Sequence, residues 1–409
     1  MFVGITNTPR PYAWGSTTAI AQLLGHEASG SPEAELWLGA HAGSPSVILD
    51  PTQTAGATNL EEWIAADPLT TLGRFAASGR LPFLLKVLAA ASPLSLQAHP
   101  TLEQARAGFN RENDSGVALD APERNYKDAF PKPELIYALS TFEALCGFRP
   151  LGKVQALLHA LIEASHSQED PQPQPLEDLL DALSAGEVAL PKTFEWLIGQ
   201  RTGVATLVSL VVTLAQQGVA GYEPEMATVV QLAQQFPGDP GIVISLLLNR
   251  VTLAAGEALY LPAGNIHAYL SGLGVELMAA SDNVLRGGLT PKHIDVPELI
   301  DVLDFTPVAV PYLHSTSPSA GVAVFTPDGA DFTLFHIDSR VLDGMVFDVS
   351  VALTGPAIAL CTHGEVAISG ATSAAALVLG ESVYITPDEM ELRFTGSGTV
   401  FVATTGVSA

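Results

Sequence analysis

The sequence predicts a mainly β protein with a helical insertion, and three observations lead there. Short apolar runs separated by Gly and Pro fill residues 1–150 and resume at Ile242, as in strands and turns. GEALYLPA at 256–263 and GESVYITP at 380–387 repeat one pattern: a Gly turn, an alternating strand and a Pro turn. Residues 151–235 instead carry apolar side chains at helical spacing. Regular short strands are typical of jelly-roll or cupin barrels, so we expect two such barrels plus an α-helical domain.

In chain order, residues 1–150 are expected to form the first part of a β domain, and residues 151–239 the helical insertion. Its apolar stripes predict core packing and not a cofactor site; they consist of Val154, Leu157, Leu158, Leu161, Ile162, Met226, Val229 and Val230. PQPQP at 171–175 predicts a linker between helices, and PGDP at 237–240 predicts the end of the insertion.

Residues 240–320 are expected to return to the first β domain, with strand-like sequence from Ile242. Residues 321–409 are expected to form a second, cupin-like domain without a metal. There, LCTHGEVAISG at 360–370 predicts two strands joined by a turn at His363, and Glu391 occupies the position that His267 has in the first copy of the repeat.

Composition favours a cytoplasmic protein. The 409 residues allow two or three domains, and two cysteines cannot form a disulfide framework. A net charge of −25 with only 18 Lys and Arg argues against nucleic acid as a partner. The apolar stretch at 203–215 is too short to span a bilayer and predicts a buried helix. We expect neither a membrane partner nor a secretory signal.

The segment PLSLQAHP is the first of the chemically informative motifs. Side chains alternate faces along a strand, so Ser95, Gln97 and His99 share one face and Leu94, Leu96 and Ala98 the other. A strand that is apolar on one side and polar on the other is expected to line a polar cavity.

Two further motifs carry matching ligands: Glu134 in FPKPELIY and His267 in LPAGNIHAYL, where Tyr269 repeats the alternation. A single His on a strand is usually an ordinary polar residue. In combination, however, the imidazoles, the carboxylate and the Gln97 amide suit zinc, with manganese or iron as substitutes. We therefore predict a metal site made of Gln97, His99, Glu134 and His267.

The amino-acid sequences of these segments resemble those of the class I phosphomannose isomerases. The resemblance rests on blocks in the family's order that cover most of the chain outside its middle and C-terminal end: PYAWGS at 11–16, ELWLGAHAGSPS at 35–46, LPFLLKVL at 81–88, PLSLQAHP, KPELIYALSTFEALCGFRP at 132–150, the long block at 256–295 and PELIDVLDF at 297–305. QAHP together with GNIHAYL and NVLRGGLTPK is a highly specific combination.

The resemblance implies a catalytic cupin domain built from residues 1–150 and 240–320, a helical domain and a C-terminal barrel. It implies an aldose–ketose isomerase that interconverts mannose 6-phosphate and fructose 6-phosphate through an enediol. It also implies one zinc ion per chain and a small sugar phosphate as partner, and we expect a monomer.

Residue roles carry over position by position. The resemblance implies that Arg286 and Lys132 are catalytic, with Lys132 a proton-transfer group. Substrate binding is assigned to Lys86, Ser95, Tyr269 and Lys292, with the phosphate held by Lys86, Ser95 and Lys292. Supporting positions behind the site are assigned to Trp14, Glu35 and Asp282.

Several alternatives stay open. Lys86 lies in an apolar strand and needs a buried anion, which is either the substrate phosphate or a neighbouring carboxylate. Arg286 can pair with Asp282, and Trp14 and Glu35 can simply pack. Where the family commonly has His before KPE, this chain has Pro131, so the role of that His does not carry over and the assignment to Lys132 loses support.

Three rival functions are weaker. A cupin oxygenase or decarboxylase typically has several His in one short motif, whereas these ligands are spread out and include Gln. A sugar-binding regulator normally carries a basic DNA-binding segment, and a nucleotidyltransferase fusion would add a Gly-rich phosphate loop. Neither feature is evident in the sequence.

Overall fold

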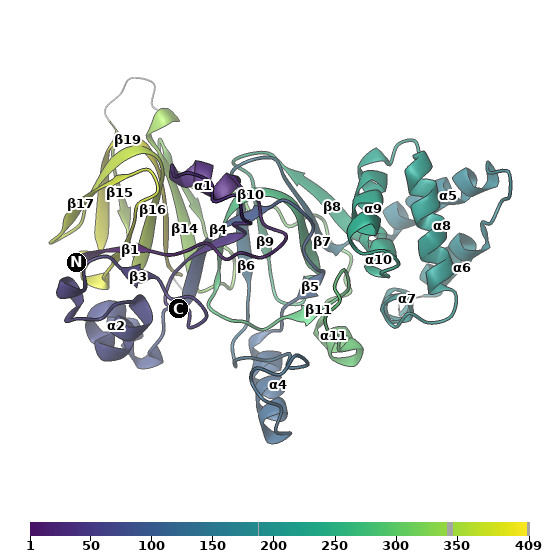
Figure 1. Cartoon of the computed structure of the whole chain (residues 1–409), viewed down its shortest axis with the longest axis horizontal. Helices are drawn as coiled ribbons and strands as arrows, with labels where there is room; N and C mark the ends of the chain where they lie inside the picture. Colours follow the sequence, from purple (N-terminus) through teal and green to yellow (C-terminus); the bar gives the residue numbers. More distant parts are fainter. Residues whose placement is uncertain (187, 342–346, 407–409) are drawn as a thin grey trace.

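The computed structural model describes residues 1–186, 188–341 and 347–406 and is mainly β with antiparallel sheets, as predicted. Figure 1 shows two sheets side by side and a block of helices at the end distant from both termini. The helices outside that block are α1 (Ala19–Leu24), α2 (Leu60–Ala66), α3 (Pro68–Leu72), α4 (Leu102–Asp114) and α11 (Val296–Val302).

The nine-stranded sheet in the middle of Figure 1 is organised around one long strand, β10. Its strands are β2 (Glu35–Leu38), β4 (Phe83–Ala90), β5 (Gln97–Ala98), β6 (Glu134–Ala138), β7 (Phe142–Phe148), β8 (Leu248–Leu253), β9 (Ala258–Leu261), β10 (His267–Ala279) and β11 (Leu285–Arg286). The first half of β10 pairs with β5 and β7, and the second half pairs with β4 and β6.

A bend in β10 joins these two halves. The pairing with β7 shifts register between Tyr269 and Ser271, and Gly272 has a φ of +127°. A Cβ at Gly272 would lie 2.8 Å from the backbone of Phe142, so only glycine fits here. Because of this bend, side chains of β5 and β7 and side chains of β4 and β6 can face the same interior.

Alternation along β4, β6 and β10 separates an apolar face from a polar one. Leu85 and Val87 of β4, like Val275 and Leu277 of β10, belong to the apolar layer between the two sheets. The residues between them point to the other side, where Lys86 is opposite Glu276 in the pairing of β4 with β10. The functional side chains therefore project into the interior of the nine-stranded sheet, away from its neighbour.

The ten-stranded sheet consists of β1 (Phe2–Thr6), β3 (Val47–Ile48), β12 (Thr316–Ser319), β13 (Val322–Phe325), β14 (Phe332–Asp338), β15 (Asp348–Ala352), β16 (Ala357–Ser369), β17 (Ala374–Val378), β18 (Ser382–Ile385) and β19 (Glu391–Thr405). β1 pairs with β18, so the start of the chain belongs to the C-terminal sheet and not to the first β domain as expected. Sequence alternation cannot reveal a pairing between residues nearly 380 positions apart.

Both copies of the repeated pattern form the strands expected of them, β9 and β18, each after a glycine with positive φ, Gly256 and Gly380. The strand–turn–strand prediction for 360–370 is wrong. β16 runs through His363 as one strand, with a register shift between Cys361 and His363 that accommodates Gly364 at a φ of +69°. Among the described strands, neither sheet closes into a ring, so the two barrels stay a prediction.

The helical block contains α5 (Leu151–His166), α6 (Gln174–Leu183), α7 (Ala189–Ile198), α8 (Val204–Gln217), α9 (Glu223–Gln235) and α10 (Gly241–Leu247). The five apolar residues predicted to form the stripe of α5 are all buried, and the stretch at 203–215 forms α8 as expected. Across the described residues, no helix combines the length and apolarity that a bilayer span requires.

The expected strand from Ile242 is in fact helix α10, all of whose residues are buried. The Asp239 carboxylate accepts a hydrogen bond from the backbone N–H of Gly241 at 2.7 Å and holds the chain at the start of this helix. An apolar run buried on all sides has no periodicity that distinguishes helix from strand.

Candidate metal centre

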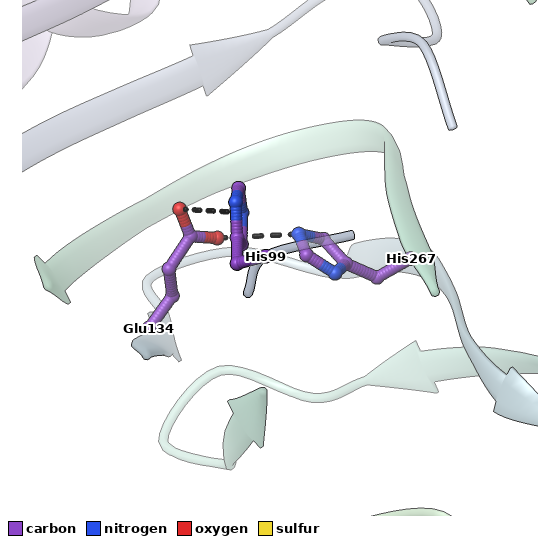
Figure 2. A group of neighbouring side chains, drawn as sticks. All are labelled: His99, Glu134 and His267. Atoms are coloured by element: carbon purple, nitrogen blue, oxygen red, sulfur yellow. Dashed lines mark ion pairs between the residues drawn. The ribbon is translucent and has the colours of Figure 1, made fainter. Parts of the chain in front are cut away.

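Three buried side chains from distant parts of the sequence converge in the nine-stranded sheet. His99 follows β5, Glu134 begins β6 and His267 begins β10, and their ligand atoms all lie within 4.8 Å of one another. Figure 2 shows the Glu134 carboxylate facing both imidazole rings. Its Oε1 is 3.3 Å from His99 Nε2 and its Oε2 is 3.2 Å from His267 Nε2.

Strand pairing produces this convergence. His267 is opposite Gln97 in the pairing of β10 with β5, and Met278 is opposite Glu134 in the pairing of β10 with β6. The bend at Gly272 lies between those two positions. Each of the three side chains is at most 2% exposed, so water does not screen their charges.

Backbone carbonyls fix which nitrogen of each imidazole faces the cluster. His99 Nδ1 donates to the carbonyl of Asn283 at 2.7 Å, and His267 Nδ1 donates to the carbonyl of Asn265 at 3.0 Å. A carbonyl only accepts, so the proton of the neutral ring is on Nδ1 and Nε2 presents a lone pair. Metal-bound histidines are usually held in this way.

In this cluster the lone pairs of the Glu134 oxygens face those of the two histidine Nε2 atoms, an arrangement that suits a bound cation. His99 Nε2 and Glu134 Oε2 are buried and have no hydrogen-bond partner among the described residues. Such an arrangement is unfavourable unless a positive charge lies between the atoms. Gln97 Nε2 is 3.3 Å from His267 Nε2, and rotating the amide would turn its oxygen toward the same point. Two imidazoles, a carboxylate and an amide oxygen therefore fit a divalent metal such as zinc.

Lys132 adds a positive charge beside the cluster, with its Nζ 3.1 Å from Glu134 Oε1. Burial raises the pKa of the Glu134 carboxyl, but Lys132 and His99 outweigh this and hold the pKa well below its usual range. Burial, with Lys132 nearby, lowers the pKa of His99 to about 4. Both groups are thus in the deprotonated form that binds metal.

A second buried ion pair supports this layer. Lys86 is 5% exposed, and its Nζ lies 2.9 Å from Glu276 and 3.7 Å from Glu35. Burial by itself lowers the pKa of Lys86, but the carboxylates of Glu276 and Glu35 raise the pKa by a larger amount, so the ammonium stays charged. The Tyr269 hydroxyl donates to Glu276 at 2.9 Å. The sequence left either a substrate phosphate or a carboxylate as the anion beside Lys86, and the structure contains the carboxylate of Glu276.

A cavity of about 360 Å³ is lined by Trp14, Ser95, Gln97, Arg286 and Lys292, among others. Gln97 belongs both to this cavity and to the cluster, so the two adjoin. Arg286 forms no ion pair with a described residue, and burial lowers its pKa. Asp282, the partner left open for Arg286, pairs instead with His41 at 3.2 Å.

The predicted site residues thus fall into four groups. Gln97, His99, Glu134, His267 and Lys132 lie at the cluster, while Ser95, Arg286, Lys292 and Trp14 line the cavity. The third group is buried: Lys86 pairs with Glu35 and Glu276, and Tyr269 donates to Glu276. Asp282 lies apart from these residues and pairs with His41.

Sequence reasoning missed two of the structure's polar partners, Glu276 and His41. The signal for Glu276 was present, since GVELMA places one charge in an apolar strand just as FLLKVL does for Lys86. His41 had no comparable signal, because it lies after β2 in a segment without alternation.

Comparison with known proteins adds relatives across nearly the whole chain. Residues 2–151 match the model of the family described as phosphomannose isomerase type I, catalytic domain. Mannose-6-phosphate isomerase of Salmonella typhimurium is 36% identical over 401 residues, covering 96% of this chain and 97% of that protein. The human enzyme of the same name is also 36% identical, covering 88% of this chain and 87% of that protein.

Solved structures agree with these relatives. A zinc-bound holo mannose 6-phosphate isomerase superposes with a TM-score of 0.85 at 33% identity, covering 99% of this chain and 100% of that chain. Sequence and fold point to the same group of enzymes.

Proposed function

This chain belongs to the type I phosphomannose isomerase family, and from that premise we propose that it interconverts mannose 6-phosphate and fructose 6-phosphate with a bound divalent metal. It is an enzyme of this family. The observation that carries the proposal is the buried cluster of His99, Glu134 and His267, whose lone pairs converge beside a cavity lined with cationic side chains.

The metal would be zinc, one ion per chain, held by Gln97, His99, Glu134 and His267. The zinc-bound relatives support this identity, as does the ligand chemistry. When bound, the ion acts as a Lewis acid toward substrate oxygen.

The cavity would hold the sugar phosphate. Lys292 is exposed at its mouth and Ser95 lies on its wall, so together they offer a charge and a hydroxyl to the phosphate. The substrate-binding role of Lys86 stays a proposal: its ammonium already neutralises Glu276, and the residue is absent from the lining of this cavity. Lys86 would also hold Glu276 and Glu35 in position.

Isomerisation moves a proton between C1 and C2, which we assign to an enediol path. Lys132, which is buried beside Glu134, would move or hold that proton. Arg286 projects a guanidinium into the cavity without an ion-pair partner among the described residues, so its charge is free to stabilise a developing oxyanion. Tyr269 and Glu35 would keep Glu276 and Lys86 in position.

Several wider features belong to the same proposal. The two sheets would be cupin-type barrels. The catalytic domain would consist of residues 1–150 and 240–320 except for β1, β3 and β12, which pair within the ten-stranded sheet. A helical domain would follow at 151–239 and a metal-free domain at 321–409, of which residues 342–346 and 407–409 lie outside the described residues. The repeated strand pattern at β9 and β18 supports this. We also propose a cytoplasmic monomer whose partner is a small sugar phosphate.

A coupled assay on purified protein tests the activity. The metal-loaded protein should convert mannose 6-phosphate to fructose 6-phosphate, and should ignore unphosphorylated mannose because the phosphate contacts would be missing. Chelation should stop turnover, and added zinc should restore it. A sugar-binding regulator would show no turnover and an oxygenase would consume oxygen, so either result would overturn the proposal.

A further inference from the structure

The segment that begins with β11 carries both cations of the active-site cavity, Arg286 and Lys292. Its first part is held by strand pairing. Arg286 is opposite Gln97 in the pairing of β11 with β5. The N–H of Gly287 then donates to the carbonyl of Leu96 at 2.8 Å. This pairing fixes Arg286, but it ends before the chain reaches Lys292.

The second part of the segment is held by one carboxylate, that of Asp239. Its Oδ1 accepts a hydrogen bond from the N–H of Leu289 at 3.0 Å, and its Oδ2 accepts a longer one from the N–H of Thr290 at 3.4 Å. The same Oδ1 also accepts from the N–H of Gly241 at the start of α10. Asp239 is the last residue of the helical insertion, so one side chain joins the insertion to the cavity wall beside β11 (Figure 1).

The backbone around Asp239 is shaped so that this carboxylate can approach. A Cβ added at Gly241 would lie 2.8 Å from Asp239 Oδ1, and one added at Gly288 would lie 3.2 Å from the same atom. Leu289 follows in the left-handed region with a φ of +55°, although it is buried. A leucine keeps such a conformation only where its surroundings impose it. The path of the chain after Gly288 is therefore imposed, and Asp239 supplies hydrogen bonds that impose it.

A short series of contacts leads from Asp239 to Lys292. The N–H of Thr290 donates to Asp239, and the Thr290 hydroxyl accepts from the N–H of Lys292 at 3.2 Å. Pro291 lies between them and restricts the backbone torsions. The Lys292 side chain is exposed, so packing does not fix its ammonium, and the position of the backbone decides what the ammonium can reach.

We infer that Asp239 is a positioning residue for phosphate recognition, an inference that rests on the proposed function. Its carboxylate sets the backbone of residues 289–292 so that the Lys292 ammonium reaches the phosphate of the sugar. Asp239 is absent from the lining of the cavity and acts through Lys292. Because β11 holds Arg286 independently, Asp239 affects substrate binding more than the chemical step.

Kinetics on the metal-loaded protein test this. Asp239→Ala should raise KM for mannose 6-phosphate about tenfold, because a displaced ammonium loses its charge-assisted hydrogen bond. The value of kcat should change less than about threefold, since Arg286 keeps its place. The control is Asp67→Ala, which removes a carboxylate that accepts from the N–H of Thr70 at the start of α3. It should leave both constants unchanged.

A double-mutant cycle separates positioning from a general effect on the fold. In the Lys292→Ala protein, the further change Asp239→Ala should raise KM less than about twofold, because the group that Asp239 positions is already gone. That result supports the inference. An increase as large as the one in the wild-type background overturns it, because Asp239 would then act without Lys292. An unchanged KM in Asp239→Ala alone overturns it as well.

A second variant serves if Asp239→Ala does not fold. In Asp239→Asn the side-chain oxygen can still accept from Gly241 and Leu289, but the amide NH2 faces the N–H of Thr290. KM should therefore rise by less, with the same dependence on Lys292, and a wild-type KM in this variant overturns the inference.

Equilibrium dialysis of labelled mannose 6-phosphate measures binding whether or not the sugar is isomerised. Binding that follows the expected pattern in a protein without turnover overturns the proposed function and supports the role of Asp239. Turnover in a protein whose sugar-phosphate binding ignores Asp239 overturns the inference alone.

Discussion

The two sheets share a strand pattern but fill their interiors differently. The ten-stranded sheet encloses an apolar cluster that includes Phe335, Ile337, Phe394 and Val402. The nine-stranded sheet instead encloses ion pairs and imidazoles at its inward-facing positions. The same backbone therefore serves as scaffold or as site, according to which side chains occupy the inward positions.

This difference has an energetic consequence. An apolar interior is stable by itself, whereas buried charges are stable only when each has a partner. In the nine-stranded sheet, Lys86 and Lys132 balance carboxylates, but the facing lone pairs of His99 and Glu134 are left for a cation. We expect perturbations of the first sheet to abolish function or folding, and matched perturbations of the second to have small effects.

The largest contrast should come from removing a buried carboxylate in each region. Glu134→Gln should lose the metal and with it all turnover, because a neutral amide cannot balance a dication held by two imidazoles. Glu389→Gln changes a fully buried carboxylate beside β18 and should retain the metal. Metal content by mass spectrometry and the coupled assay measure both. A metal-free Glu134→Gln protein with full activity would refute the metal site.

Ion pairs provide the next comparison. Lys86→Ala leaves Glu276 buried without its ammonium and should lower the free energy of unfolding by about 3–5 kcal/mol. Arg393→Ala breaks the Arg393–Asp348 pair of the second sheet, whose side chains are 60% and 43% exposed, and should cost about 0–1 kcal/mol.

Urea unfolding of both variants measures the difference. Adding Glu276→Gln to Lys86→Ala should recover part of the lost stability, because the uncompensated charge is then gone. Equal losses in the free energy of unfolding for Lys86→Ala and Arg393→Ala would show that Lys86 does not balance a buried charge in the first sheet.

Much of this contrast was predictable because it depends on alternation within single strands. Gln97 and His99 face one way and Leu96 and Ala98 the other, so the sequence alone places two residues of the metal site on a polar face. The remaining two ligands came from motifs, whose imidazole and carboxylate chemistry predicted one shared metal site, and the family resemblance then implied the same site. Roles beyond the ligands also came only from that resemblance.

What could not be predicted depends on distant or featureless segments. The pairing of β1 with β18 joins residues that no local pattern connects. Helix α10 is apolar on every side, so its sequence has no period. The partner of Lys86 required knowing that β4 and β10 pair in a register that places Glu276 opposite it.

Catalysis should distinguish two arginines. Arg286→Ala should keep the metal and the fold but lower kcat about a hundredfold or more, the scale of losing one preorganised charge-stabilising donor. Arg393→Ala, in the second sheet, should leave kcat unchanged. Unimpaired kcat in a folded, metal-loaded Arg286→Ala protein would remove the catalytic assignment of Arg286 while leaving the isomerase itself.

Phosphate recognition should show a smaller effect confined to binding. Lys292→Ala should raise KM for mannose 6-phosphate about ten- to a hundredfold with metal content unchanged, because one charge-assisted hydrogen bond is worth about 1.5–3 kcal/mol. Arg201 is an exposed cation of the helical block, paired with Glu195, and Arg201→Ala should leave KM as it is. A wild-type KM in Lys292→Ala would place the phosphate elsewhere.

The smallest effect concerns the partly buried imidazole of the second sheet, His336, and it vanishes at neutral pH. Burial lowers the pKa of His336 from 6.5 to about 4. Above pH 6.5 the ring is neutral in both folded and unfolded chains, so it adds no pH dependence. Between pH 6.5 and 4 only the unfolded chain takes up the proton. The free energy of unfolding therefore falls with decreasing pH, by at most about 1.4 kcal/mol per pH unit from this group.

His336→Gln should remove that contribution. Urea unfolding at several pH values from 7 to 4.5 should give a shallower loss of stability for the variant than for wild type, and comparing the two curves cancels the acid release of metal, which both share. His314→Gln removes an exposed imidazole and should reproduce the wild-type slope. Parallel curves for wild type and His336→Gln would mean that His336 takes up its proton in the folded protein as readily as in the unfolded chain. The imidazole of His336 would then contribute nothing to the pH dependence of the stability of the second sheet.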